Sequence, residues 1–259
     1  MKKHQLKVVK IGGKLIENEH DLNLFLEDFT SLEGPKILVH GGGKMATELA
    51  DKLGYKTTMV DGRRITDANT MDVITMTYAG LINKKIVAKL QALQSNTVGL
   101  CGADGKSIIS KKRPVKEIDF GFVGDVEEIN THFISSLLVQ DITPVFSAIS
   151  CSKEGQLFNT NADSVAAEIA IAFSSEYETE LFFCFEKNGV LQDPSDDTSV
   201  VEKLDTVRYQ KLLKDGIISE GMLPKLHNCF YALEEGVSKV SLGGPNLLQE
   251  DSIHTKILK

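Results

Sequence analysis

Two glycine clusters, each directly after an apolar run, are the residues of this chain best suited to chemistry. Lys10, Gly12 and Gly13 end the first run, and Gly41-Gly42-Gly43 ends the second. Glycine lets backbone amides approach phosphate oxygens closely, and the N-terminus of a following helix adds a favourable dipole. A lysine beside such amides would neutralise negative charge. The pair of clusters therefore predicts phosphoryl transfer, although either cluster alone could be only a tight turn.

The familiar nucleotide-binding signatures are missing. Neither GxxxxGK[ST] nor a GxGxxG after a strand occurs in the sequence, which argues against an ordinary P-loop or dinucleotide-binding fold. The prediction of a phosphate site therefore rests on the two clusters together with charged residues elsewhere in the chain.

Four charged or amide residues could complete such a site. Asn159 and Asp163 flank Asn161. A role as helix N-cap explains Asn161, but it does not explain Asn159 or Asp163. Asp163, in the first turn of a helix, could orient a lysine. Lys225 stands at the start of another helix, where an isolated lysine is usually only a solvated surface group. One of the two adjacent arginines, Arg63 or Arg64, could clamp a carboxylate through two hydrogen bonds, whereas the other is better explained as a solvated loop charge.

The elements that must position these residues alternate between short apolar runs and longer amphipathic segments. This alternation predicts an α/β fold, with a central, mostly parallel sheet covered by helices on both faces. Ligands of such sheets bind at the carboxyl ends of the strands, where the glycine clusters lie. We expect strands at 6–11, 37–40, 97–100, 143–149, 181–185 and 237–242, an antiparallel excursion within 106–128, and helices at 21–30 (capped by Asp21), 45–53, 70–94 (with a break at Gly80), 130–140, 161–173, 206–214 and 222–235.

Composition narrows the class of protein. The chain has 259 residues, 42% hydrophobic and 25% charged, with a net charge of −7, which disfavours a dedicated nucleic-acid binder. No apolar run approaches the ~20 residues that span a bilayer, and the N-terminus lacks a signal sequence, so we expect a cytoplasmic protein. The four cysteines form no CxxC pair and no histidine lies at ligand spacing near them. Buried free thiols are therefore expected, and no metal site.

Taken together, the glycine clusters and the charged segments described above resemble the amino acid kinase family and, within it, the branch that phosphorylates N-acetylglutamate. The order of several motifs is more specific than any one of them. His-Gly-Gly-Gly, Gly-x-Arg and Asn-x-Asn-Ala-Asp separate this branch from the carbamate, aspartate, glutamate 5- and uridylate kinases. The resemblance rests on Lys10-Ile11-Gly12-Gly13, Val39-His40-Gly41-Gly42-Gly43, Gly62-Arg63-Arg64, Gly99-Leu100-Cys101-Gly102-Ala103-Asp104-Gly105, Gly121-Phe122-Val123-Gly124-Asp125-Val126, Asn159-Thr160-Asn161-Ala162-Asp163 and Gly221-Met222-Leu223-Pro224-Lys225.

The resemblance implies a three-layer αβα kinase domain with two lobes, about 1–175 for the acyl amino acid and about 176–259 for the nucleotide. It implies ATP-dependent phosphorylation of the side-chain carboxylate of an N-acyl-L-glutamate, in arginine biosynthesis, by a homodimer. Mg²⁺ would be carried by the nucleotide. In these roles Lys10 holds the transferring phosphoryl group, Lys225 bridges the leaving β-phosphate and Asp163 orients both lysines. Substrate would be bound by Gly42, Gly43, Arg64 and Asn159, and the nucleotide by Gly12, Gly13, Glu186, Gly189, Val190, Leu191 and Ser219.

Three positions depart from the family pattern. Phe185-Glu186 replaces a Thr-Asp pair, His254 precedes Thr255 where glycine is usual, and Ser150 stands where glycine often follows a strand. These changes leave alternatives open: a larger acyl group such as succinyl, another amino acid kinase such as a carbamate kinase, or a catalytically weakened regulatory subunit. The arginine-inhibited members carry an extra N-terminal helix, and this chain starts a few residues before its first strand. Insensitivity to arginine is therefore expected.

Overall fold

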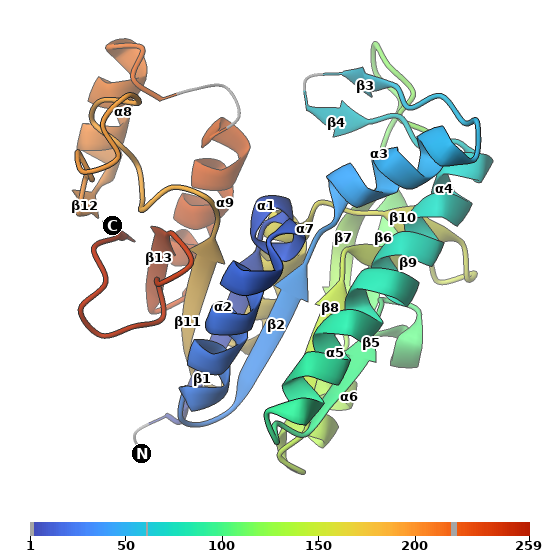
Figure 1. Cartoon of the computed structure of the whole chain (residues 1–259), viewed down its shortest axis with the longest axis horizontal. Coiled ribbons are helices and arrows are strands. Elements are labelled where there is room, and N and C mark those ends of the chain that lie inside the picture. Colours follow the sequence, from blue (N-terminus) through green and yellow to red (C-terminus); the bar gives the residue numbers. More distant parts are fainter. Residues whose placement is uncertain (1–2, 61, 219–221) are drawn as a thin grey trace. The chain divides into compact units, whose positions relative to one another are not determined.

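The computed structural model describes residues 3–60, 62–218 and 222–259. The chain divides into two compact units (Figure 1). Unit 1 combines Met1–Ile37 with Ala166–Lys259, and unit 2 is Leu38–Val165. The family resemblance implies two lobes that meet near residue 175. In the structure, residues 1–37 group with the C-terminal part of the chain, because β1 (Gln5–Ile11) pairs in parallel with β11 (Glu178–Cys184).

Unit 1 builds its part of the main sheet in the strand order β12-β14-β13-β11-β1. β1, β11 and β13 run parallel, whereas β14 is antiparallel to β13 and parallel to β12. Val8 to Ile11 are buried without interruption, so both faces of this sheet are covered. The remaining strands are β12 (Lys203–Leu204), β13 (Lys239–Gly243) and β14 (Thr255–Ile257), and the helices are α1 (Gly13–Glu17), α2 (Glu19–Ser31), α8 (Thr206–Lys214), α9 (Leu223–Glu234) and most of α7 (Ala162–Phe173).

Unit 2 contains the parallel strands β2-β8-β5 and a four-stranded sheet in the order β10-β9-β6-β7 (Figure 1). The antiparallel pair β6–β7 confirms the excursion predicted within 106–128. The main strands are β2 (Lys36–His40), β5 (Thr97–Leu100) and β8 (Thr143–Ser147); the others are β3 (Met59–Val60), β4 (Arg63–Arg64), β6 (Ile108–Lys112), β7 (Gly124–Ile129), β9 (Ile149–Cys151) and β10 (Leu157–Asn159), and the helices are α3 (Gly43–Lys52), α4 (Ala68–Ile74), η1 (Thr75–Ile82), α5 (Asn83–Ala92), η2 (Asp104–Lys106) and α6 (Thr131–Leu138).

The predicted α/β class with a mostly parallel sheet is confirmed, and the errors are local. The run 143–149 is not one strand, because β8 ends at Ser147 and β9 continues in the second sheet. The long helix is not broken at Gly80; it passes through the π-helical turns of η1. The N-cap of α2 is Asn18, whose Oδ1 accepts hydrogen bonds from the amides of His20 and Asp21. None of the helices within the described ranges is both long and apolar enough to cross a membrane.

Candidate active site

The carboxyl end of β1 presents Lys10 and two glycines. Lys10 is 8% exposed, so its side chain is almost entirely buried. The Gly12 amide donates to the Cys184 carbonyl at 3.0 Å, which fixes the turn against the end of β11. Gly12 is the N-cap of α1 and carries no capping side chain, and Gly13 begins the helix. The structure therefore places the predicted glycines in the turn between β1 and α1.

Lys225 occupies the first turn of α9, close to the same end of β11. Its ammonium lies 5.3 Å from the ring centroid of Phe183 and 5.5 Å from that of Phe185. Burial raises the pKa of the Cys184 thiol, and the charges of Lys10 and Lys225 both act in the opposite direction. Both lysines therefore lie within electrostatic reach of Cys184. The structure brings together two cations that are more than two hundred residues apart in sequence.

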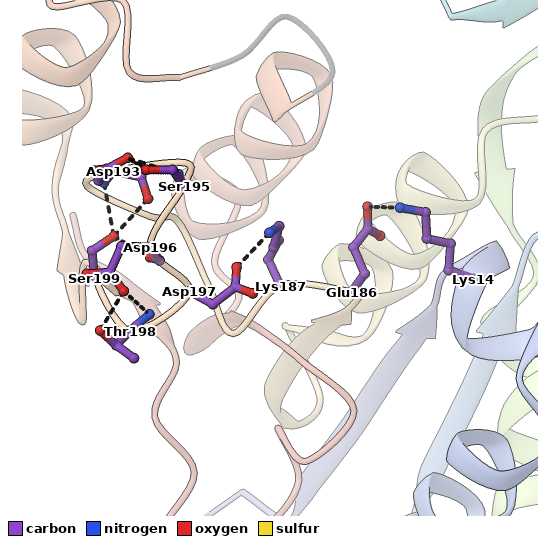
Figure 2. Close-up of polar contacts among 9 residues, drawn as sticks. All are labelled: Lys14, Glu186, Lys187, Asp193, Ser195, Asp196, Asp197, Thr198 and Ser199. Atoms are coloured by element: carbon purple, nitrogen blue, oxygen red, sulfur yellow. Dashed lines mark hydrogen bonds and ion pairs between the residues drawn. The ribbon is translucent and has the colours of Figure 1, made fainter.

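Glu186, expected to contact the nucleotide, forms an ion pair with Lys14 at 3.1 Å (Figure 2). Burial raises the pKa of Glu186, but the hydrogen bond from Lys14 and the nearby lysine charges outweigh it, so the pKa lies below its ordinary value. The carboxylate is therefore ionised at neutral pH. Both side chains are substantially exposed, so the pair contributes little stability. Lys14 was not predicted as a site residue, because nothing local in the sequence links it to Glu186.

The segment after Glu186 is anchored by Thr255 on β14. The Val190 amide donates to the Thr255 hydroxyl at 2.8 Å, and Leu191 forms a bridge with Val200. A side chain at Gly189 would collide with the same hydroxyl. These contacts explain why Gly189, Val190 and Leu191 keep a defined path despite the changed residue at 254.

The loop that follows is closed by its own carboxylates (Figure 2). Asp193 accepts hydrogen bonds from the amide and hydroxyl of Ser195, and Asp196 does the same for Thr198. Asp197 pairs with Lys187 at 2.6 Å. These acidic groups therefore organise the loop.

In unit 2 the glycine cluster packs against the π-helical segment. A Cβ atom on Gly42 would overlap the Cδ1 atom of Ile82 and press on the Tyr78 ring at 3.1 Å. Gly42 also caps α3, which begins at Gly43, without any side-chain hydrogen bond. A side chain at position 42 would therefore force the end of the Ile82 side chain to move.

Arg64 is held beside this turn. It is 8% exposed, and its Nη2 donates to the Gly43 carbonyl at 2.7 Å and to the Thr47 hydroxyl at 2.8 Å. Its Nη1 donates to Thr57 at 3.2 Å. These three acceptors are neutral, so they orient the guanidinium without neutralising its charge. Such an arrangement suits recognition of a carboxylate.

Asn159 ends β10 and donates through Nδ2 to the Thr66 hydroxyl at 3.0 Å. Thr66 is fully buried, and no pattern in the sequence singles it out. Ser150, one of the departures from the family pattern, is also fully buried, and its hydroxyl lies 2.6 Å from that of Thr160. The hydroxyl at 150 is therefore engaged inside unit 2.

Asp163 lies in the first turn of α7, in unit 2, while the two lysines belong to unit 1. Asn161 accepts hydrogen bonds from the amides of Asp163 and Ser164, which confirms it as the cap of this helix. Ser219, predicted to bind nucleotide, lies outside the described residues. Across 3–60, 62–218 and 222–259, no group of three or more His, Cys, Asp or Glu side chains could hold a metal ion.

His40 forms a buried network that the sequence did not predict. Its Nδ1 lies 2.9 Å from the Gly41 carbonyl, and its Nε2 lies 3.1 Å from Nδ2 of Asn83. Because a carbonyl only accepts and an amide nitrogen only donates, the proton is assigned to Nδ1 of a neutral ring. The pKa of His40 is lowered to about 4, mainly by burial. The hydrogen bond with the Gly41 carbonyl opposes this lowering, and the charge of Lys84 adds to it. His40 therefore fixes the start of the glycine turn.

Comparison with known proteins gives consistent matches. The sequence profile of the amino acid kinase family matches residues 5–243. A protein of Parabacteroides distasonis, described as an acetylglutamate kinase, is 50% identical over 236 residues, which are 91% of this chain and 92% of that protein. An N-acetylglutamate synthase from Neisseria gonorrhoeae superposes with a TM-score of 0.83 at 21% identity, over 100% of this chain and 60% of its own. A carbamate kinase from Giardia lamblia superposes with a TM-score of 0.73 at 11% identity, over 100% of both chains.

Proposed function

Because the chain belongs to the amino acid kinase family, we propose that it transfers the γ-phosphoryl group of ATP to the side-chain carboxylate of N-acetyl-L-glutamate. The product is an acyl phosphate, formed in arginine biosynthesis. The observation that carries the proposal is that Phe183 lies beside Lys10 in the β1–β11 register and 5.3 Å beneath the Lys225 ammonium, at the carboxyl ends of these two strands.

Charge neutralisation is the main task of this site. The carboxylate nucleophile is already ionised at neutral pH, so the reaction needs no general base. The nucleophile and the γ-phosphate are both anionic and repel each other. Two lysines offset this repulsion most strongly where charge builds up in the transition state. His40 is buried as a neutral ring in its own network and serves as a support for the turn rather than as a base.

Substrate recognition falls to unit 2 in this proposal. Arg64 binds the α-carboxylate, because its guanidinium is oriented by neutral partners and keeps its charge. Asn159, steadied by Thr66, binds the acyl-amide region. Gly42 and Gly43 supply backbone amides. The relatives that are about half identical to this chain are described as acetylglutamate kinases, so we expect the acetyl substrate to be preferred over larger acyl groups.

Nucleotide binding falls to unit 1 in this proposal, and Asp163, in the first turn of α7, is the third catalytic residue. Mg²⁺ bound to the phosphates would offset part of their negative charge. In this proposal the ion arrives with the nucleotide and keeps most of its ligands from the phosphates and water. The proposal also includes a homodimer in the cytoplasm, and multi-angle light scattering tests the mass.

The deciding experiment measures ADP release by a coupled assay with ATP and four acceptors: N-acetyl-L-glutamate, N-succinyl-L-glutamate, free L-glutamate and carbamate. N-acetyl-L-glutamate should support turnover, N-succinyl-L-glutamate should support less, and free L-glutamate should support none above background. Nucleotide binding without turnover on either acylated substrate would contradict the proposal and favour a regulatory subunit. Turnover on carbamate alone would assign the chain to another reaction of the family.

A further inference from the structure

An aromatic platform lies beneath the Lys225 ammonium, and one of its two rings is a departure from the family pattern. Phe183 is the penultimate residue of β11, and Phe185 follows the strand. The ring centroids lie 5.3 Å and 5.5 Å from the Lys225 nitrogen. Both distances are within the range in which a ring face attracts a cation through its quadrupole.

The two rings are held rigidly. Phe183 is fully buried and lies between Lys10 of β1 and Leu242 of β13 in the sheet register. Phe185 is 7% exposed, and its amide donates to the Gly243 carbonyl at 3.0 Å. Because backbone pairing fixes both residues, the platform is in place without the nucleotide. A lysine over it has a preferred position rather than the wide choice of rotamers that a solvated lysine has.

Aromatic rings suit this position because they attract a cation without neutralising it. Lys10 and Lys225 both act on Cys184, so two positive charges lie near the same residue and repel each other. Ring faces offset part of this repulsion and add no negative charge that would repel the phosphates.

We propose that Phe185 is a positioning residue that holds the Lys225 ammonium over its ring, so that the charge is in place when the nucleotide phosphates bind. This inference rests on the proposed function for the role of Lys225. It assigns the phenylalanine a part in phosphoryl transfer, through the lysine and not by contact with the reacting atoms.

The kinetic test compares three variants. F185L keeps an apolar side chain and removes the ring, whereas F185Y keeps the ring. F182L is the control: Phe182 is half-buried, and its side chain points to the face of β11 opposite to that of Phe183. F185L should lower kcat about 2- to 30-fold, with the KM for the acylglutamate unchanged. F185Y should recover most of that loss, and F182L should stay within about twofold of the native rate. Native kcat in F185L, or equal losses in F185L and F185Y, would overturn the proposal.

A second measurement does not depend on turnover. Lysines are dimethylated with ¹³C-formaldehyde, which preserves their charge, and the Lys225 resonance is assigned by its loss in K225R. Methyl groups above ring faces should resonate upfield of the other lysines, and this shift should shrink in F185L but persist in F185Y. An unshifted Lys225 resonance would refute the platform even if the enzyme is active. A shifted resonance in a protein without kinase activity would refute the proposed function and leave the platform standing.

Discussion

The buried histidine at the end of β2 makes the stability of this protein depend on pH in a defined window. His40 is fully buried, and its pKa is lowered to about 4 from an ordinary value of 6.5. Above pH 6.5 the ring is neutral in both the folded and the unfolded chain. As the pH falls from 6.5 towards 4, the unfolded chain binds a proton that the folded chain does not, so stability is lost.

The size of this loss follows from the shift. Each pH unit inside the window costs about 1.4 kcal/mol, so the free energy of unfolding should fall by about 2 kcal/mol between pH 6.5 and pH 5 because of His40 alone. In the His40→Gln variant, the side-chain amide still offers one donor and one acceptor in place of the two ring nitrogens, but it cannot titrate. The variant should therefore lose about 2 kcal/mol less than the native chain over the same interval.

Urea denaturation at both pH values measures this difference, provided that the slope with denaturant stays constant. His20→Gln is the matched control, because His20 is exposed. The control should keep the full pH dependence of the native chain. A His40→Gln variant that loses as much stability as the native chain would refute the assignment of a buried neutral imidazole.

Three further outcomes are expected. Arg64→Lys should raise the KM for the acylglutamate at least about tenfold with a smaller change in the KM for ATP, since lysine cannot make the planar contacts of the guanidinium; equal rises in both constants would contradict a substrate-binding role. Gly121→Ala should lower the free energy of unfolding by about 2 kcal/mol or more, because Gly121 has a φ of +71° and a Cβ there would overlap the Thr66 carbonyl; an unchanged urea midpoint would contradict this. Glu186→Gln should change the unfolding free energy by less than about 1 kcal/mol, since its ion pair with Lys14 is exposed, so a larger loss would show that the pair is structural.

Much of the fold could be predicted because its signals are local. Apolar runs that end in glycines mark β1 and β2, and the alternation with amphipathic segments predicts a covered parallel sheet. The capping residue Asn161 located the start of α7. The strands β12 and β14 were missed because they are only two and three residues long and carry no periodic pattern.

Other features could not be predicted because their causes are not local. Asn18 and Asp21 are both good capping residues, and only the backbone path decides that Asn18 caps α2. The apolar run 143–149 gives no sign that the chain changes sheet around Ala148. The contact between His40 and Asn83 joins residues 43 apart, and that between Lys14 and Glu186 joins residues 172 apart. Sequence could therefore predict the candidate lysines and glycines but not the side chains that hold them in place.

The most direct test of the account replaces one of the two converging lysines. Lys10→Ala is compared with Lys7→Ala, which removes a more exposed lysine nearer the start of the same strand. With ATP and N-acetyl-L-glutamate, kcat of the Lys10 variant should fall by about 10²- to 10³-fold while its urea midpoint stays close to native. The Lys7 variant should keep its rate. A Lys10 variant that is folded and turns over at the native rate would contradict the claim that paired lysines drive phosphoryl transfer.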